Sequence, residues 1–227
     1  LKKCKELGKN PVSLGVDTWG VDFVLLGKDG GVLGNTVGYR DHRTDGMDEE
    51  VYKIISQNDL YARTGIQKAI YNTIYQLMAV KKKYPQYMEQ ADSLLFVPDY
   101  FHYLLCGKKV NEYTEATTSQ LINAQTNDWD YELMDMLGYK KAMFNELVMP
   151  GTSLGNLRPE LAEEIGYDLE IVVPCTHDTG SAVLAVPAND DDFVYISSGT
   201  WSLMGVEMAR PDCSQQSCDL NFTNEGG

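Results

Sequence analysis

One pattern restricts the possible folds of this chain more than any other. It is a short apolar run that leads through an acidic loop into a stretch of small residues. Residues 170–173 have the composition of a buried strand, His177 and Asp178 follow at the turn, and residues 179–186 suit a helix that packs closely on a sheet. Such strand–loop–helix units are typical of α/β folds, whose ligands bind at the carboxyl edge of the sheet. We therefore expect an α/β protein with a polar site at Asp178.

A second polar turn follows between two predicted strands at 193–196 and 202–206, and its sequence is Ser197-Ser198-Gly199-Thr200-Trp201-Ser202. Such a turn can offer backbone N–H groups and hydroxyls to an anion such as phosphate. Together with a carboxylate that accepts a proton, it indicates phosphoryl transfer to an alcohol. Taken alone the turn is weak evidence, because most turns of this composition only reverse the chain.

Composition excludes several classes of protein. The chain has 227 residues, of which 43% are hydrophobic and 23% charged, as in an ordinary globular protein. No apolar stretch approaches the roughly 20 residues that span a bilayer, so we expect no membrane association. The formal net charge of -14 repels nucleic acid, and we expect no nucleic acid as a partner.

The five cysteines are scattered and do not have the spacing of a disulfide framework. We therefore expect reduced thiols and a cytoplasmic location. Cys213 and Cys218 lie near each other, but no second pair of Cys or His follows that would complete a zinc site. We assign no metal ligand from the sequence.

Alternating strand and helix patterns fill the chain. Strands are predicted at 13–17, 21–26, 32–39 and 94–97, and helices at 45–57, 72–84, 98–105, 116–122, 129–137 and 159–165. The strands 21–26 and 32–39 are predicted to form a hairpin. The polar stretch 187–192 interrupts the pattern and predicts a domain boundary after residue 187.

Both ends of the chain have the pattern of an interrupted fold. Residues 1–8 indicate the last turns of a helix closed by Gly8, and no initiator methionine precedes them. Residues 220–227 indicate a strand that leads into a loop. We therefore expect a fragment of a longer protein, with one domain over 1–187 and only the beginning of a second over 188–227.

Two other interpretations of Asp178 stay open from the residues alone. An Asp before an apolar helix is a good N-cap, and its oxygen would then be committed to a backbone N–H. The tetrapeptide Asp178-Thr179-Gly180-Ser181 also matches the active-site signature of aspartic proteases. Those enzymes need two aspartates that share a proton, whereas this tetrapeptide occurs once, and the predicted helices disfavour an all-β protease.

Trp19 and Gly20 follow the first predicted strand and place a flat ring and bare backbone at the same sheet edge. Trp19 is either a core residue or a wall for the face of a sugar. Arg40 and Asp41, with Arg43, are either a surface ion-pair cluster or contacts to hydroxyl groups at a cleft.

Six segments of the chain together resemble the FGGY family of carbohydrate kinases, and they are residues 15–26, 39–44, 98–101, 112–118, 177–179 and 197–205. They occur in family order along nearly the whole chain, so they are far more specific than the short protease-like match. The resemblance implies the ribonuclease-H-like α/β fold of actin and the sugar kinases, in which two domains close over sugar and ATP. Residues 1–187 would then be the sugar-kinase domain without its first strands, and 188–227 the beginning of the nucleotide-binding domain.

The resemblance also implies roles for the residues of the sugar site. Asp178 would be the general base on a ketose hydroxyl and would also contact the sugar. His177, Thr179 and Gly20 would be further sugar contacts, and Trp19 is the candidate wall beside them.

For the second substrate, the resemblance implies ATP with Mg²⁺, and Thr200 with Gly199 would meet the nucleotide phosphates. The implied reaction is ATP-dependent phosphorylation of the ketose L-rhamnulose at O1. A kinase for L-fuculose or D-xylulose is one alternative, and a non-catalytic actin-like nucleotide-binding module is another. The first phosphate loop of the family is absent, so we expect no turnover by this chain alone.

Overall fold

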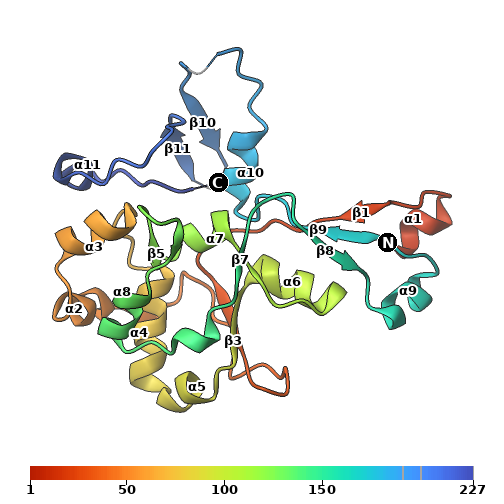
Figure 1. Cartoon of the computed structure of the whole chain (residues 1–227), viewed down its shortest axis with the longest axis horizontal. Helices are drawn as coiled ribbons and strands as arrows, with labels where there is room; N and C mark the ends of the chain where they lie inside the picture. Colours follow the sequence, from red (N-terminus) through yellow and green to blue (C-terminus); the bar gives the residue numbers. More distant parts are fainter. Residues whose placement is uncertain (191, 200, 227) are drawn as a thin grey trace.

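The computed structural model describes residues 1–190, 192–199 and 201–226 (Figure 1), so the predicted phosphate contact Thr200 lies outside the described residues. The α-helices are α1 Lys2–Glu6, α2 Met47–Tyr52, α3 Gln57–Thr64, α4 Thr73–Lys83, α5 Pro85–Gln90, α6 Val97–Cys106, α7 Tyr113–Thr117, α8 Tyr131–Leu137, α9 Pro159–Ile165, α10 Asp178–Leu184 and α11 Gln215–Asp219, with 3₁₀ turns at His42–Thr44 and Lys141–Met143. The strands are β1 Ser13–Leu14, β2 Phe23–Leu26, β3 Ser93–Phe96, β4 Asn111–Glu112, β5 Ile122–Asn123, β6 Asp128–Trp129, β7 Leu147–Val148, β8 Ser153–Asn156, β9 Glu170–Val172, β10 Tyr195–Ser198 and β11 Ser202–Gly205.

The strand that precedes the acidic loop lies in the middle of a three-stranded sheet with the order β1-β9-β8. β1 runs parallel to β9, with Leu14 opposite Ile171, and β8 runs antiparallel to β9. The other strands form the pairs β2–β3, β4–β7, β5–β6 and β10–β11. Because β1 and β9 are parallel, their carboxyl ends meet at one edge, and the loops after them lie together there.

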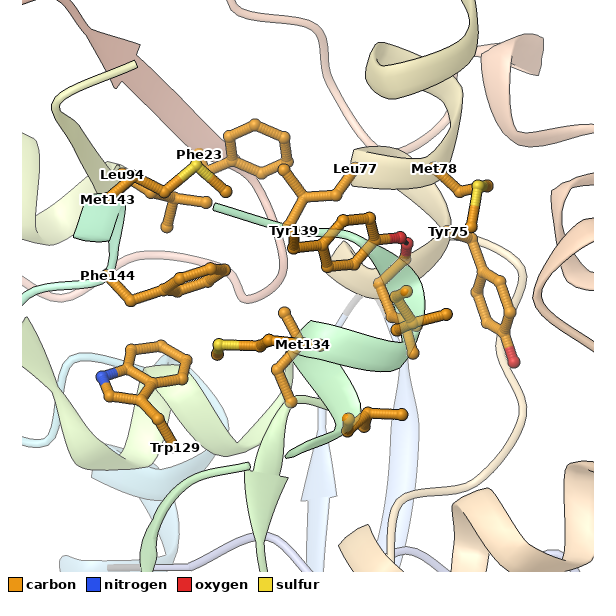
Figure 2. Packing of buried hydrophobic residues seen from close by; sticks show 14 of the residues in the cluster. Phe23, Tyr75, Leu77, Met78, Leu94, Trp129, Met134, Tyr139, Met143 and Phe144 are labelled. Carbon is orange, nitrogen blue, oxygen red and sulfur yellow. Dashed lines mark hydrogen bonds between the residues drawn. The ribbon is translucent and has the colours of Figure 1, made fainter. Parts of the chain in front are cut away.

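The larger hydrophobic core lies between the β2–β3 pair and helices α4 and α8 (Figure 2). Phe23 of β2, Leu77 of α4 and Met134 of α8 point into it, and the rings of Trp129 and Phe144 pack with their centroids 4.8 Å apart. Burying a large apolar side chain contributes about 1.5–3 kcal/mol, so this cluster is the main source of stability in the first part of the chain.

A second core lies beside the three-stranded sheet and consists of Leu154, Leu157, Leu169, Ile171 and Val173. Side chains of α6 and α9 pack against it. In Figure 1 this smaller lobe stands opposite the helices of the larger one, and α6 lies between them. The candidate site loops leave the sheet at the junction of the two lobes.

Most of the predicted helices are confirmed. The helix predicted at 159–165 is α9, and the one predicted at 72–84 is α4. Gly8 closes the first helical segment with a φ of 67°. In the described part of the chain no helix is long and apolar enough to cross a membrane.

The predicted hairpin partner of β2 is wrong. Residues 32–39 form no strand, and only an isolated bridge between Leu26 and Val32 links them to β2. The other edge of β2 pairs with β3 over its whole length, with Phe23 opposite Phe96. Gly34, at a φ of 71°, turns the segment away from an extended course.

Two further predicted elements are wrong. The helix expected at 116–122 is the earlier α7, because Gln120 adopts a φ of 63° that no helix tolerates. The strand expected at 220–227 is absent over 220–226, which follow α11 and return to the first core. Local composition did not show that these residues are used for long-range contacts.

Candidate active site

The loops after β1 and β9 are joined by backbone hydrogen bonds. The N–H of Thr18 donates to the carbonyl of Thr176 at 2.9 Å, and the N–H of Asp178 donates to the carbonyl of Thr18 at 2.8 Å. This parallel bridge brings the Trp19–Gly20 turn and the His177–Asp178 turn together at the sheet edge. The structure therefore places the two predicted loops side by side.

Asp178 is the first residue of α10, and its carboxylate does not cap the helix. His177 occupies the N-cap position, and no side chain makes a capping hydrogen bond there. Oδ1 of Asp178 accepts a hydrogen bond from the N–H of Thr179 at 2.7 Å, and 58% of the side chain is exposed. Asp178 is therefore not the N-cap residue, although one of its oxygens accepts a backbone N–H of the first turn, and the exposed carboxylate is open to a hydroxyl group.

His177 lies between two carboxylates and is only 12% exposed. Its Nδ1 is 2.9 Å from Oε2 of Glu225, and its Nε2 is 3.6 Å from Oδ1 of Asp178. Burial lowers the pKa of His177. The hydrogen bond and charge of Glu225, together with the charges of Asp178 and Glu112, raise it by more than burial lowers it. The pKa of His177 is therefore above its ordinary value.

Gly20 lies in close contact with the other loop. A Cβ at this position would stand 3.1 Å from the side chain of Thr118 and 3.3 Å from Cδ2 of His177. The next residue, Val21, has a φ of 68°, a conformation that strains a β-branched residue. Oγ1 of Thr118 accepts the N–H of Val21 at 3.1 Å, while the hydroxyl of Thr73 donates to its carbonyl at 2.7 Å. Tertiary hydrogen bonds hold this strained turn in place.

Trp19 is 48% exposed, so its interpretation as a core residue is wrong. Its indole Nε1 donates to Oδ2 of Asp22 at 2.8 Å, which fixes the ring. Asp22 is buried and also accepts hydrogen bonds from the N–H of Tyr39 and from Nε2 of Gln76. Burial raises the pKa of Asp22. These hydrogen bonds and the positive charge of Arg43 lower it, but they only partly offset the effect of burial.

An open cleft lies beside the Trp19 ring. Trp19, Asp22 and residues 35–41 line it, and Arg40 and Asp41 are among them. Arg43 turns inward instead, where it hydrogen-bonds Gln76 and the carbonyl of Val37 and lies over the ring of Phe23. The hypothesis of hydroxyl contacts at a cleft thus stays open for Arg40 and Asp41, while Asp178 lies outside the lining.

Sequence reasoning missed Glu112, whose side chain holds the loop that carries His177 and Asp178. Glu112 is buried, and its carboxylate accepts the N–H and hydroxyl of Thr114, the N–H of Glu115, and the N–H and hydroxyl of Thr176. Thr114 in turn accepts the N–H of His177 at 3.3 Å. These bonds connect the start of α7 to the loop that carries Asp178. The segment 112–118 was part of the resemblance, but it carried no assigned role.

The predicted phosphate turn is the hairpin between β10 and β11. The N–H of Gly199 donates to the carbonyl of Trp201 at 2.8 Å, and no atom would lie within 4 Å of a Cβ on Gly199. The space beside Gly199 is therefore open, although its N–H is engaged. Over the described ranges, no group of three or more His, Cys, Asp or Glu residues could hold a metal ion.

A known protein family matches most of the chain. The description "FGGY family of carbohydrate kinases, N-terminal domain" matches residues 2–185. The chain belongs to the FGGY family. This membership agrees with the resemblance carried by the six segments of the sequence, and the all-β protease interpretation of Asp178-Thr179-Gly180-Ser181 is wrong.

Curated FGGY relatives match over the whole chain. A protein named rhamnulokinase from Halalkalibacterium halodurans is 55% identical over 227 residues, which are 100% of this chain and 48% of the relative. A rhamnulokinase from Bacteroides thetaiotaomicron is 45% identical over 228 residues, which cover 100% of this chain and 47% of that protein. The chain thus spans about half the length of the curated relatives it matches.

Solved structures of sugar kinases share the fold. The ligand-bound xylulose kinase from Lactobacillus acidophilus superposes with a TM-score of 0.84 at 22% identity, covering 92% of this chain and 43% of that one. A Plasmodium falciparum glycerol kinase with ADP gives a TM-score of 0.76 at 15% identity, covering 89% and 42%. The fold is therefore the ribonuclease-H-like α/β architecture of the FGGY sugar kinases.

Proposed function

We propose that the protein containing this chain is an ATP-dependent kinase that phosphorylates the ketose L-rhamnulose at O1. The observation that carries this proposal is the 55% identity to a rhamnulokinase along the entire chain. An exposed carboxylate at the sheet edge, next to a largely buried histidine, offers the chemistry that such a kinase needs. The comparisons do not favour a kinase for L-fuculose or D-xylulose, or a non-catalytic nucleotide-binding module.

In the proposed reaction, Asp178 is the general base. Its exposed carboxylate accepts the proton of the O1 hydroxyl as that oxygen attacks the γ-phosphorus of ATP, and the bond from phosphorus to the leaving ADP oxygen breaks. A positioned base of this kind is worth about 10²- to 10⁴-fold in rate. Mg²⁺ bound with the nucleotide would neutralise charge on the phosphate oxygens.

The other predicted residues position the two substrates. His177 and Thr179 flank the base and would hydrogen-bond sugar hydroxyls. Gly20 would contact the sugar through its backbone, and its missing side chain lets the first loop approach His177 closely. Trp19, held by Asp22, would cover one face of the sugar, since an aromatic ring packs on the C–H groups of a pyranose or furanose.

The nucleotide would lie on the other side of the site. The turn at Gly199 and Thr200 would contact its phosphates, and residues 188–227 would begin the nucleotide-binding domain, with 1–187 as the sugar-kinase domain. Five free cysteines suit the reducing cytoplasm, where ATP is available.

Asp178→Asn tests the proposal in a version with the length of the curated relatives. We expect kcat with L-rhamnulose and MgATP to fall by about 10²- to 10⁴-fold, because the amide cannot take the proton, while sugar affinity measured by calorimetry changes little. Asp190→Asn, at an exposed position in the predicted linker, is the matched control and keeps full activity. Assays with L-fuculose and D-xylulose establish selectivity, and NMR of the product identifies the phosphorylated oxygen. Retention of kcat in the Asp178 variant would refute the assigned base.

A further inference from the structure

The last part of the chain returns to the first core and ends at the candidate active site. We call residues 211–226 the C-terminal strap. In Figure 1 its helix α11 lies beside α3, and the hydroxyl of Tyr61 in α3 donates to the carbonyl of Phe222 at 3.0 Å. The N–H and Nδ2 of Asn224 both donate to the carbonyl of Gly65, at 2.9 and 3.0 Å. The strap is therefore anchored to the domain that carries the sugar site.

The strap is also closed on itself. The N–H of Asp212 donates to Oδ1 of Asn224 at 2.8 Å, and Nδ2 of Asn224 donates to the carbonyl of Asp212 at 3.1 Å. The hydroxyl of Ser217 donates to the carboxylate of Asp212 at 2.6 Å. The N–H of Gly226 then donates to Oγ1 of Thr117 at 3.3 Å. Residues on both sides of Glu225 are thus held against the first domain.

These anchors deliver the carboxylate of Glu225 to His177. Oε2 of Glu225 lies 2.9 Å from Nδ1 of His177, and the Glu225 side chain is 31% exposed. We propose that Glu225 is a positioning residue that accepts the Nδ1–H of His177 and so directs Nε2 toward Asp178 and the sugar. The family description matches residues 2–185, so the contact comes from a segment beyond that match.

Orientation matters because the two ring nitrogens of histidine have different roles. When Nδ1 carries the proton and donates to Glu225, the neutral ring presents an acceptor at Nε2, 3.6 Å from Oδ1 of Asp178. An acceptor there can bind a sugar hydroxyl next to the base. The titratable groups that act on this ring are Glu225 from the strap, Asp178 from α10 and Glu112 from the start of α7.

The contact also sets the charge of the ring. Without the carboxylate of Glu225, the pKa of His177 would fall, because burial lowers it and only the charges of Asp178 and Glu112 would still raise it. A protonated ring loses the acceptor at Nε2, so sugar affinity should decline as the pH falls through the pKa of His177. The part of this inference that concerns the sugar rests on the proposed function.

Imidazole NMR of this chain tests the contact without any activity assay. The sequence has three histidines; His42 is exposed, and burial lowers the pKa of His102 to about 4, so the signals separate. In Glu225→Gln, which keeps an acceptor but removes the charge, we expect the pKa of His177 to fall while Nδ1 stays protonated. In Glu225→Leu the pKa falls and the Nε2–H tautomer appears. Glu207→Gln, an exposed residue, is the charge-matched control and changes neither property.

Kinetics in a version with the length of the relatives tests the consequence. Glu225→Leu should raise the KM for L-rhamnulose about 10-fold with a smaller effect on kcat, and Glu225→Gln should restore most of the affinity. Glu225→Gln should also lower the pH below which sugar affinity declines, because it lowers the pKa of His177. A purely structural role would lower stability in both variants but would not move this pH limit.

The outcomes separate the two proposals. An unchanged tautomer and pKa of His177 in both Glu225 variants would overturn the positioning role. The same holds if Glu225→Leu alters the His177 signals but leaves the sugar KM within twofold of that of the unsubstituted protein. If the unsubstituted protein phosphorylates none of the ketoses, the proposed function fails, whereas the NMR result still decides whether Glu225 controls His177.

Discussion

Around Asp178, the fit between side chains leaves little freedom for substitution. Gly20 stands against Thr118 and His177, and Val21 holds a strained backbone conformation beside it. Strain of this kind persists only where surrounding hydrogen bonds over-determine the backbone, and here Thr118 supplies one of them. Gly20 and Val21 together let the loop after β1 contact the loop after β9.

Gly20→Ala should disturb this contact. The added methyl would meet Thr118 at 3.1 Å and His177 at 3.3 Å, and overpacking of this kind costs about 1–3 kcal/mol. We expect a lower free energy of unfolding in urea and weaker sugar binding by calorimetry. Gly180→Ala is the matched control, because its methyl would meet Thr114 and Cys175 at ordinary distances of 3.8 and 4.0 Å. Equal sugar affinity in both variants would show that Gly20 needs no such space.

Glu115 is a buried carboxyl whose two oxygens have no hydrogen-bond partner among the described residues. Burial, with the nearby carboxyls of Asp99 and Glu112, raises its pKa well above the model-peptide value of 4.5. Below pH 4.5 the folded and unfolded states both hold the proton, so this group adds no pH dependence there. Above it, the unfolded chain ionises first, so stability falls as the pH rises toward the folded pKa.

Glu115→Gln should therefore stabilise the fold in a pH-dependent way. The amide has a similar shape to the protonated acid but does not titrate, so the gain in unfolding free energy should be near zero at pH 4 and larger at pH 7. Urea unfolding at both pH values measures it. Glu163→Gln, at an exposed position of α9, controls for a general charge effect and should show no such trend. A gain that is the same at both pH values would contradict the raised pKa.

Among the elements, the short helix α7 and the loop after β9 behave as one unit because Glu112 bonds to both. Its carboxylate accepts two hydrogen bonds from Thr114 and two from Thr176, residues separated by 62 positions in the chain. Hydrogen bonds to charged groups contribute about 1.5–3 kcal/mol each. The position of His177 and Asp178 thus depends on a side chain from another element.

Glu112→Ala should break this unit. We expect a loss of about 3 kcal/mol or more in the free energy of unfolding, because the N–H groups of Thr114 and Thr176 are left buried without an acceptor. Hydrogen exchange of the 174–178 loop should accelerate as well. The exposed Glu163→Ala serves as control and should stay within about 0.5 kcal/mol. Destabilisation without faster exchange in that loop would refute the link between α7 and the site.

The elements that local patterns predicted well are those with local start and stop signals. Helix α9 begins with Pro159 at its first turn and is closed by Gly166 at a φ of 84°, and both signals are visible in the sequence. The segment 32–39 has a strand-like composition but forms no strand, and β2 instead pairs along its other edge with β3. Pairing choice is a property of the whole sheet, so composition alone did not reveal it.

For the molecule as a whole, the proposed sugar contacts and the proposed phosphate turn lie on different elements. The proposed sugar contacts lie in the loops after β1 and β9, the β10–β11 hairpin carries the proposed phosphate turn, and the strap returns from there to α3. The chain spans about half the length of its curated relatives. Catalysis by phosphoryl transfer depends on positioning both substrates at once.

This chain alone should therefore bind sugar weakly and should not turn over. We expect calorimetry to show L-rhamnulose affinity below that of a version with the relatives' length, little affinity for MgATP, and no phosphorylation in a coupled assay. The longer version, measured in parallel, is the control for substrate quality. Phosphorylation by the 227-residue chain at a normal kinase rate would contradict this division of the site.

The proposed site residues stand out in the sequence because each follows a local pattern. Asp178 stands after an apolar strand and before a small-residue helix, and Trp19–Gly20 stands after another strand, so a parallel sheet brings both to one edge. The contacts that orient them were not recognisable. Glu225 meets His177, and Glu112 meets Thr176, through folding of distant segments. Side-chain hydrogen bonds across such distances depend on the packing of whole elements, which no local pattern in the chain encodes.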